Sequence, residues 1–171
     1  MNKLPQDIKV FNHLNFPDQR GDLKCIFESE QNLEIEGFSS KLSTSKPFVA
    51  RGIHWQNQKS PQIKAISVLK GSITDFLINL DKDSEDFGNF FTYDLDADSN
   101  KTLYIPSHYG HGFFAKEETI FFYFCFGKYS EKNEITVNLK DLVNNRTSLN
   151  SKNWIISEKD RKAKYFGDIF L

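Results

Sequence analysis

Short apolar segments that follow one another at regular spacing dominate the middle of this sequence. Three stretches, 62–80, 87–106 and 111–130, each hold two such segments, separated by Lys70–Gly71, by DADSN at 96–100 and by AKEE at 115–118. Short alternating runs with turn residues between them are typical of β-strands, so each stretch predicts an antiparallel hairpin. Hairpins in series favour an all-β sandwich or barrel of the jelly-roll type.

Helical structure is expected only near the C-terminus. The segment DLVNNRTSLNSKNW at 141–154 is expected to be irregular. The segment 157–170 predicts a short helix, with Ser157 as N-cap and Asp160 three residues later. No Pro-rich linker or repeat divides the chain, so the sequence predicts a single domain over 1–171.

Composition excludes several classes of protein. With 26% charged residues and a net charge of -1, the chain has neither the signature of disorder nor the basic footprint of a nucleic-acid-binding protein. It has no apolar run of about 18 residues that would span a bilayer and no secretory leader, so no membrane partner is expected. Two distant cysteines, Cys25 and Cys125, do not form a disulfide framework, which favours a cytoplasmic location.

The stretch ARGIHWQNQKSPQIK at 50–64 places polar residues inside an otherwise apolar strand pattern. Alternation puts two sets of side chains on opposite faces, unless a bulge at Gly52 changes the phase. The first set is Gly52, His54 and Gln56, and the second is Arg51, Ile53 and Trp55. A polar lining of this kind indicates a ligand cavity.

Lys64 shares a strand face with Ile66 and Val68. A buried lysine is costly unless it meets an anion, so Lys64 indicates a ligand or a carboxylate nearby. The alternative is that Lys64 lies at the strand end and reaches water. His54 taken alone is more often a hydrogen-bonded core histidine than a catalyst.

A second polar cluster, YIPSHYGHGFF at 104–114, contains His108 and His111. With His54, these histidines suggest a metal site of the cupin kind. Such a site also needs an acidic ligand, and the corresponding positions near His54 hold glutamines, so a metal is disfavoured. Further along the chain, Tyr129 is either a general acid or a rim aromatic, and Asp160 either caps a helix or lies on the surface.

Taken together and in this order, the motifs resemble those of the dTDP-4-dehydrorhamnose 3,5-epimerases and related nucleotide-sugar epimerases. The similarity extends from about Asp18 to Asp168. Its segments are Asp18, Arg20 and Gly21 near the start, RGIHWQ at 51–56, PQIK at 61–64, PSHYGHGF at 106–113, Tyr129 with Glu134, and ISEKD at 156–160.

The resemblance implies a double-stranded β-helix, the cupin jelly roll, which acts without a cofactor and forms a homodimer that exchanges N-terminal strands. It implies that His54 is the general base paired with Asp160, that Lys64 stabilises an enolate, and that Tyr129 is the acid on the opposite face. The substrate is then a nucleotide-diphosphate 4-keto-6-deoxy sugar. Its other contacts are Arg51, His111, Gln56, Ser43, Ser45, Lys41 and Arg20 of the partner subunit.

The main departure from the family pattern lies in SSKLSTS at 39–45, where Ser39 and Lys41 replace a Gln and an Asn of the family motif. We therefore expect proton-transfer chemistry on a somewhat different nucleotide-linked sugar, at C3, at C5 or at both. Three alternatives remain at this point. They are a 3,4-ketoisomerase of the same fold, a metal-dependent cupin using His54, His108 and His111, and a non-catalytic sugar-binding jelly roll.

Overall fold

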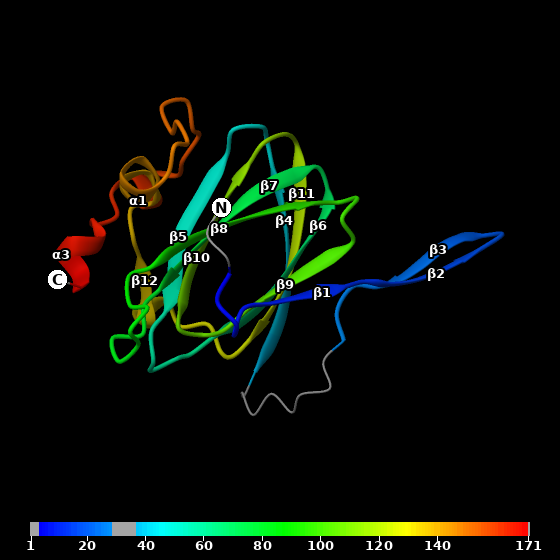
Figure 1. Cartoon of the computed structure of the whole chain (residues 1–171), viewed down its shortest axis with the longest axis horizontal. Coiled ribbons are helices and arrows are strands. Elements are labelled where there is room, and N and C mark those ends of the chain that lie inside the picture. The colour runs from blue at the N-terminus through cyan, green and yellow to red at the C-terminus, as the bar shows by residue number, and fades with distance from the viewer. Residues whose placement is uncertain (1–3, 29–36, 171) are drawn as a thin grey trace.

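Two five-stranded antiparallel sheets face each other in the computed structural model, which describes residues 4–28 and 37–170 (Figure 1). The first sheet has the order β1-β9-β6-β11-β4, and the second has the order β12-β5-β10-β7-β8. The strands of the first sheet are β1 (Lys9–Asn12), β9 (Lys101–Ile105), β6 (Ile63–Lys70), β11 (Thr119–Phe126) and β4 (Phe38–Ser45). Those of the second are β12 (Glu134–Thr136), β5 (Ala50–Gln56), β10 (Tyr109–Ala115), β7 (Ser72–Asn79) and β8 (Phe90–Asp96). The all-β jelly-roll prediction is confirmed.

The three predicted hairpins are wrong in their pairing, although their strands are where the sequence places them. In each stretch the two strands belong to opposite sheets: β6 and β7, β8 and β9, and β10 and β11. Ile66 of β6 and Leu77 of β7 instead lie in the same buried cluster between the sheets. Each of the two strands has an apolar face to bury. When the strands lie in opposite sheets, these two faces pack against each other in the core, and both are buried. The chain therefore crosses from sheet to sheet at each turn.

Gly71 is the only residue between β6 and β7, and the crossing requires a glycine there. Its φ is +77°, and a Cβ at this position would lie 2.4 Å from the carbonyl oxygen of Glu118. No side chain fits so close to a backbone oxygen, so the sharp crossing depends on this glycine.

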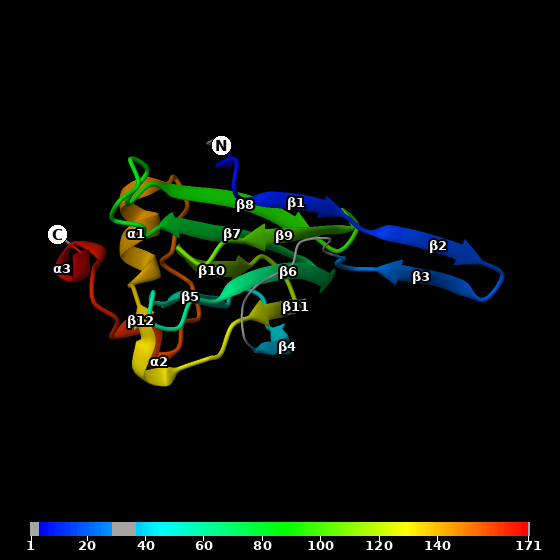
Figure 2. The same ribbon diagram turned by 90° about the horizontal axis from the view of Figure 1, so that it is seen from below.

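The second sheet is buried on both faces. Its inner face meets the first sheet, and its outer face is covered by the C-terminal segment, where Trp154 and Phe166 pack with Trp55 and Phe76. Figure 2 shows the helices on this outer side. A strand covered on both sides is buried at nearly every position, and in β7 every residue after Ser72 is buried, the polar Thr74, Asp75 and Asn79 included.

The helices are short and C-terminal, as predicted, with one correction. They are η1 (Glu131–Asn133), α1 (Leu139–Arg146), α2 (Glu158–Arg161) and α3 (Phe166–Phe170). Helix α1 occupies part of the segment 141–154 that the sequence predicted to be irregular. Asn138 caps it by accepting a hydrogen bond from the N–H of Asp141. Its own residues Leu142 and Val143 are buried. Helix α1 is too short for a helical spacing of apolar residues to be evident in the sequence, and packing against the rest of the fold stabilises it.

A two-stranded arm projects from the barrel (Figures 1 and 2). It consists of β2 (Leu14–Asp18) and β3 (Gly21–Cys25), which pair only with each other. Strand β1, by contrast, pairs with β9 of its own chain. The expectation of a single domain over 1–171 stays a prediction, and residues 1–3, 29–36 and 171 lie outside the described part. Within the described part, no helix has the length and apolarity needed to cross a membrane.

Candidate active site

A polar cavity of about 210 Å³ opens between the two sheets. Its walls come from β4, β5 and β12, from β6, β10 and β11, and from the segment that follows β11. The lining residues are Lys41, Ser43, Arg51, His54, Trp55, Gln56, Gln62, Lys64, His111, Gly112, Phe113, Phe121, Tyr123, Cys125, Tyr129 and Glu134. Most of the residues singled out from the sequence therefore meet in one place.

A bulge in β5 turns both Arg51 and His54 into the cavity. Arg51 pairs with Phe113 and His54 with His111, so β5 uses three residues where β10 uses two. Gly52 lies in this bulge with φ +105°, and a Cβ there would be 2.7 Å from the Cα of Gly112. The phase change considered for Gly52 is thus present. It brings together two side chains that strict alternation separates.

His54 and Asp160 form a close pair. The Nε2 atom of His54 lies 2.7 Å from Oδ1 of Asp160, and Oδ2 of Asp160 accepts a hydrogen bond of 3.3 Å from the backbone N–H of Gly52. Ser157, the N-cap of α2, accepts a hydrogen bond from the backbone N–H of Asp160. Asp160 is therefore no surface carboxylate, since its exposed fraction is 4%.

Asp160 stays ionised in this setting. Burial raises the pKa of its carboxyl, but the hydrogen bond and charge of His54 and the N–H of Gly52 outweigh burial, so the pKa lies below its usual range. A carboxylate at Nε2 fixes the proton of His54 on that nitrogen and leaves Nδ1 with a free lone pair. His54 is thus arranged as a base.

Lys64 lies on the first sheet with its side chain in the cavity, and its exposed fraction is only 8%. Burial lowers the pKa of its ammonium, and the charge of Lys41 adds to this shift, while Cys125 and the charges of Glu134 and Asp75 oppose it. The reading in which Lys64 escapes to water at the strand end is wrong. A buried ammonium without a hydrogen-bonded carboxylate is a preformed site for a developing negative charge.

His111 belongs to a second histidine–carboxylate pair. Its Nε2 atom lies 2.7 Å from Oδ2 of Asp75, which is fully buried. Burial raises the pKa of Asp75, while His111 and Lys64 oppose the shift. The sequence reasoning missed Asp75, although a lone aspartate within the apolar run ITDFLIN is itself a signal, because a buried charge needs a partner.

Tyr129 lies at the mouth of the cavity and is 52% exposed. Its hydroxyl donates a hydrogen bond of 3.3 Å to Oε2 of Glu134, and the same oxygen forms an ion pair with Lys159. The ammonium of Lys41 lies 5.3 Å from the centre of the Tyr129 ring and 5.7 Å from that of Tyr123. Sequence reasoning gave no role to Glu134 or Lys159, although both stand inside the motifs it used.

The remaining predicted contacts divide into direct and indirect ones. Ser43 and Gln56 line the cavity. The side-chain oxygen of Gln56 accepts a hydrogen bond from the N–H of Ser130, and its buried amide nitrogen has no hydrogen-bond partner among the described residues. Ser45 is outside the lining and instead accepts a hydrogen bond of 3.3 Å from Nε of Arg51. Ser45 therefore acts by orienting Arg51.

Arg20 and His108 do not line this cavity, and within the described part of the chain neither forms a hydrogen bond or ion pair with a predicted catalytic residue. Arg20 is at the turn of the projecting arm, is 85% exposed and pairs with Asp18. His108 pairs with Asp7 through a contact of 2.9 Å. Each histidine of the supposed metal set thus has its own carboxylate. Among the described residues, no group of three His, Cys, Asp or Glu side chains converges in a way that would hold a metal ion.

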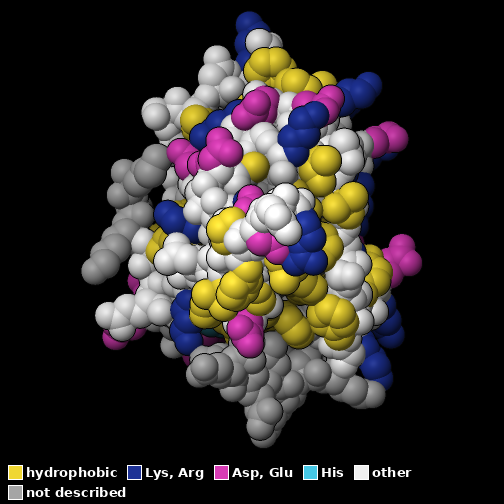
Figure 3. Space-filling model, turned by 90° about the vertical axis from the view of Figure 1, so that its right-hand side faces the viewer, with side chains coloured by type: hydrophobic (Ala, Val, Ile, Leu, Met, Phe, Trp, Pro, Cys, Tyr) yellow, Lys and Arg dark blue, Asp and Glu magenta, His cyan; other side chains and the backbone are white. Residues whose placement is uncertain are grey.

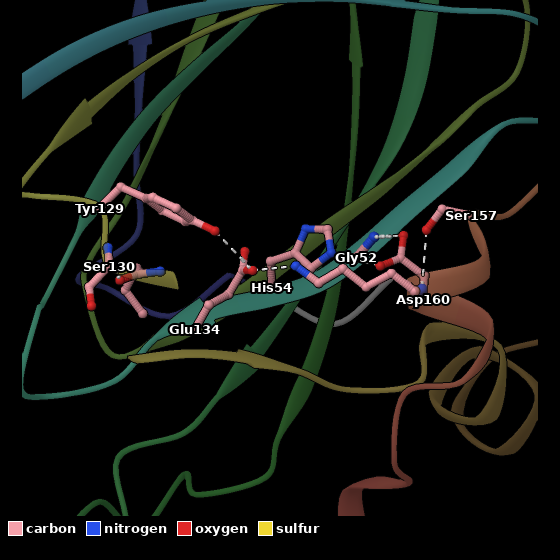
Figure 4. A network of polar contacts seen from close by, with 9 residues as sticks. Gly52, His54, Tyr129, Ser130, Glu134, Ser157 and Asp160 are labelled. Atoms are coloured by element: carbon pink, nitrogen blue, oxygen red, sulfur yellow. Dashed lines mark hydrogen bonds and ion pairs between the residues drawn. The ribbon is translucent and has the colours of Figure 1, made fainter. Parts of the chain in front are cut away.

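These features define a cupin-fold jelly roll whose inter-sheet cavity is lined by a histidine backed by a carboxylate, a buried lysine and a phenol, a set suited to acid–base chemistry. Figure 4 shows Tyr129 and Glu134 on one side of His54 and Asp160 on the other. A family model described as dTDP-4-dehydrorhamnose 3,5-epimerase matches residues 4–168. The chain belongs to the dTDP-4-dehydrorhamnose 3,5-epimerase family, which is a family of isomerases.

Individual relatives support the assignment. The dTDP-4-dehydrorhamnose 3,5-epimerase of Shigella flexneri is 27% identical over 168 residues, which cover 95% of this chain and 92% of that protein. The crystal structure of the enzyme of the same name from Sulfolobus tokodaii is 30% identical, with a TM-score of 0.83 over 96% of this chain and 93% of that one. A Legionella pneumophila epimerase in complex with dTDP-4-keto-L-rhamnose has the same fold, with a TM-score of 0.85 at 24% identity over 99% and 93% of the two chains.

Proposed function

We propose that this protein is an epimerase of a dTDP-linked 4-keto-6-deoxy sugar, inverting C3, C5 or both without a cofactor. The observation that carries the proposal is that one cavity is lined by three groups suited to proton transfer on a keto sugar: His54, which Asp160 holds, the buried Lys64, and Tyr129. Family membership supports the substrate class, because the relatives are named for this reaction.

The reaction proceeds by proton transfers on the two faces of the sugar. The 4-keto group acidifies the neighbouring C–H bonds, and Nδ1 of His54 removes one proton. The electron pair moves to O4, where the ammonium of Lys64 stabilises the enolate. Tyr129 then donates its proton to the same carbon from the opposite face, the enolate returns to the ketone, and solvent resets His54 and Tyr129. The balance requires no oxidant or reductant.

Arg51 is placed to bind the diphosphate. Its guanidinium lines the cavity next to β4, where it is fixed by Ser45 and by the carbonyl of Thr44. Lys41 lies in the same strand, β4, two positions from Ser39 and two from Ser43, and both serines are small. We propose that these three residues, the β4 row, select the nucleotide or the sugar substituents. A ketoisomerase uses the same enolate but does not need a second proton donor, so the presence of a phenol, Tyr129, in the cavity favours an epimerase.

We expect solvent deuterium to enter the substrate during turnover. In D₂O, the dTDP-4-keto-6-deoxy sugar should acquire deuterium at C3, C5 or both, together with inversion, because each inverted carbon receives its proton from solvent-equilibrated groups. NMR and mass spectrometry of the products measure both quantities. The same assay with UDP, GDP and CDP sugars as matched substrates tests the β4 row.

A ketoisomerase and a non-catalytic binding protein would each give a different result in that assay. A ketoisomerase moves the carbonyl to C3, and a binding protein protects the sugar without any exchange. If none of the four nucleotide sugars exchanges a proton with the wild-type protein, the proposed enzyme activity is wrong.

We further propose a homodimer in which the arm of each subunit reaches the cavity of the other. The arm exposes Leu14, Phe16 and Leu23, and the outer face of the neighbouring sheet exposes Phe38 and Leu42. Figure 3 shows hydrophobic side chains gathered around the arm, which projects toward the viewer. Exposed apolar surface on this scale indicates a protein partner, and a second copy offers the complementary pair of surfaces. Arg20 at the arm's turn would then meet the diphosphate.

Mixed dimers test this arrangement. We expect the purified protein to have twice the mass of the 19.9 kDa chain in light scattering. We expect Arg20→Ala to raise KM about tenfold, since a phosphate loses one charge-assisted contact. Co-expression of Arg20→Ala with His54→Asn subunits should restore a low KM, because the intact site receives an intact arm. If the KM of the mixture stays that of Arg20→Ala, the arm does not serve the partner's site.

The setting of the reaction is also a proposal. Cys25 and Cys125 are both free thiols, as expected in a reducing cytoplasm. A deoxysugar product attached to a nucleotide is an activated donor, so we place the enzyme in the synthesis of surface polysaccharides or other glycosides.

A further inference from the structure

An ion pair stands directly behind the hydroxyl of Tyr129. Oε2 of Glu134 accepts the hydrogen bond from that hydroxyl and at the same time pairs with the ammonium of Lys159. The side chain of Glu134 is only 13% exposed, and its backbone pairs with Gln56 of β5. One carboxylate oxygen thus links the proposed acid to a lysine from a distant part of the sequence.

That lysine comes from the helix that also serves the proposed base. Lys159 and Asp160 are adjacent in α2, which begins at the N-cap Ser157. Asp160 holds His54, while Lys159 holds Glu134. In Figure 4, Glu134 lies on one side of His54, and Asp160 lies on the other side with Ser157. A single helical turn therefore fixes the partners of both proton-transfer groups.

The charges around Tyr129 indicate what Lys159 does there. Burial and the charge and hydrogen bond of Glu134 raise the pKa of the phenol, Lys159 lowers it, and Glu131 raises it slightly. Lys41, from β4, adds a positive charge over the ring. A phenol that donates its proton becomes negative, and an uncompensated carboxylate at its oxygen would oppose that step.

We propose that Lys159 is a positioning residue for the reaction, which neutralises Glu134 so that Tyr129 can release its proton to the enolate. The inference rests on the proposed epimerase function and adds a role that α2 plays in inversion specifically. The competing explanation is a stabilising surface ion pair. Lys159 is 58% exposed, and exposed pairs contribute little to stability, so the two explanations differ in what they predict.

The test separates proton removal from inversion. Because His54 abstracts the proton and can return a deuteron to the same face, exchange without inversion needs no acid. We expect Lys159→Met to lower the rate of inversion about tenfold, the effect of roughly one pKa unit in the acid. Exchange with retention at the same carbon should remain within about twofold of wild type, since α2 keeps Asp160 in place. Lys159→Arg should restore inversion.

A double-mutant cycle isolates the charge. Glu134→Gln keeps an acceptor for the Tyr129 hydroxyl but removes the negative charge, so Lys159→Met added to Glu134→Gln should change inversion by less than about twofold. The matched control is Lys162→Met, which removes the exposed Lys162–Glu158 pair from the end of the same helix and should leave both rates unchanged. Circular dichroism and melting curves identify any variant that fails to fold.

A second measurement does not depend on the substrate. NMR titration of protein labelled with ¹³C at the tyrosine ζ carbon, assigned with Tyr129→Phe, should show a higher pKa for Tyr129 in Lys159→Met by about one unit. An unchanged pKa, or equal losses of inversion and exchange, overturns the role of Lys159 even if the wild type inverts its substrate. Absence of exchange and inversion in the wild type overturns the proposed function instead.

Discussion

Replacement of His54 by Asn is expected to lower kcat/KM about 10³-fold, within the range that a positioned general base contributes. Asn retains an amide N–H for Asp160, so the carboxylate keeps a partner while the basic nitrogen is lost. We expect deuterium wash-in to disappear together with product formation, because the nitrogen that removes the substrate proton is lost. Solvent exchange followed by NMR measures the effect directly.

His108→Asn is the matched control. His108 also pairs with a carboxylate, that of Asp7, but lies outside the cavity lining. It should retain wild-type exchange. A large loss in His108→Asn would revive the metal-dependent alternative, in which His54, His108 and His111 act together. Exchange that persists in His54→Asn would show that the base has been assigned wrongly.

Lys64→Met should lower activity without lowering stability. We expect kcat to fall about 10²- to 10³-fold, since the enolate oxygen loses its preorganised positive charge in a dry site. We expect the free energy of unfolding at neutral pH to stay the same or to rise by about 1 kcal/mol, because methionine fills the space without a buried charge. Kinetics and denaturant unfolding on the same sample measure both changes.

The pH dependence follows from the direction of the Lys64 shift. Because burial lowers its pKa, the unfolded chain holds the proton at pH values where the folded chain has lost it. The destabilising contribution of Lys64 is therefore complete below the folded pKa and disappears as the pH rises through the ordinary lysine range. The stability gain of Lys64→Met should shrink accordingly at alkaline pH. Lys70→Met, at the exposed end of the same strand, should change neither activity nor this profile.

A stability loss in Lys64→Met would point to another arrangement. Asp75 is fully buried, and within the described part of the chain one of its oxygens has no hydrogen-bond partner. If the charge of Lys64 is what keeps Asp75 ionised, then removing it would destabilise the fold, and part of the activity loss would reflect the His111–Asp75 pair.

Local pattern was enough to find the strands and most of the site. Residues 51–56 and 61–64 are polar where neighbouring strands are apolar, and that contrast alone indicated a cavity. His54, Lys64 and Arg51 line this cavity, Arg51 because of the bulge in β5. The histidine–aspartate pairing came from family resemblance, because no periodicity links positions 54 and 160. The structure brings the two atoms to 2.7 Å.

The errors come from features that a local pattern does not contain. Strand pairing was wrong in all three predicted hairpins, because alternation tells which face of a strand is apolar but not which strand lies beside it. Helix α1 was missed because packing of Leu142 and Val143 stabilises it. Asp75, Glu134 and Lys159 were not assigned roles, since each matters through a partner that is remote in sequence.

The sequence by itself determined the all-β class, the positions of most strands, the polar wall at 51–64 and the family. Only the tertiary structure decided which sheet each strand joins, that the bulge at Gly52 turns Arg51 and His54 to the same side, and that one turn of α2 serves both His54 and Tyr129. The physical reason is the distance along the chain over which each interaction acts. Alternation and turn chemistry act over a few neighbouring residues, whereas the charge pairs of the site join residues 25, 36 and 106 positions apart.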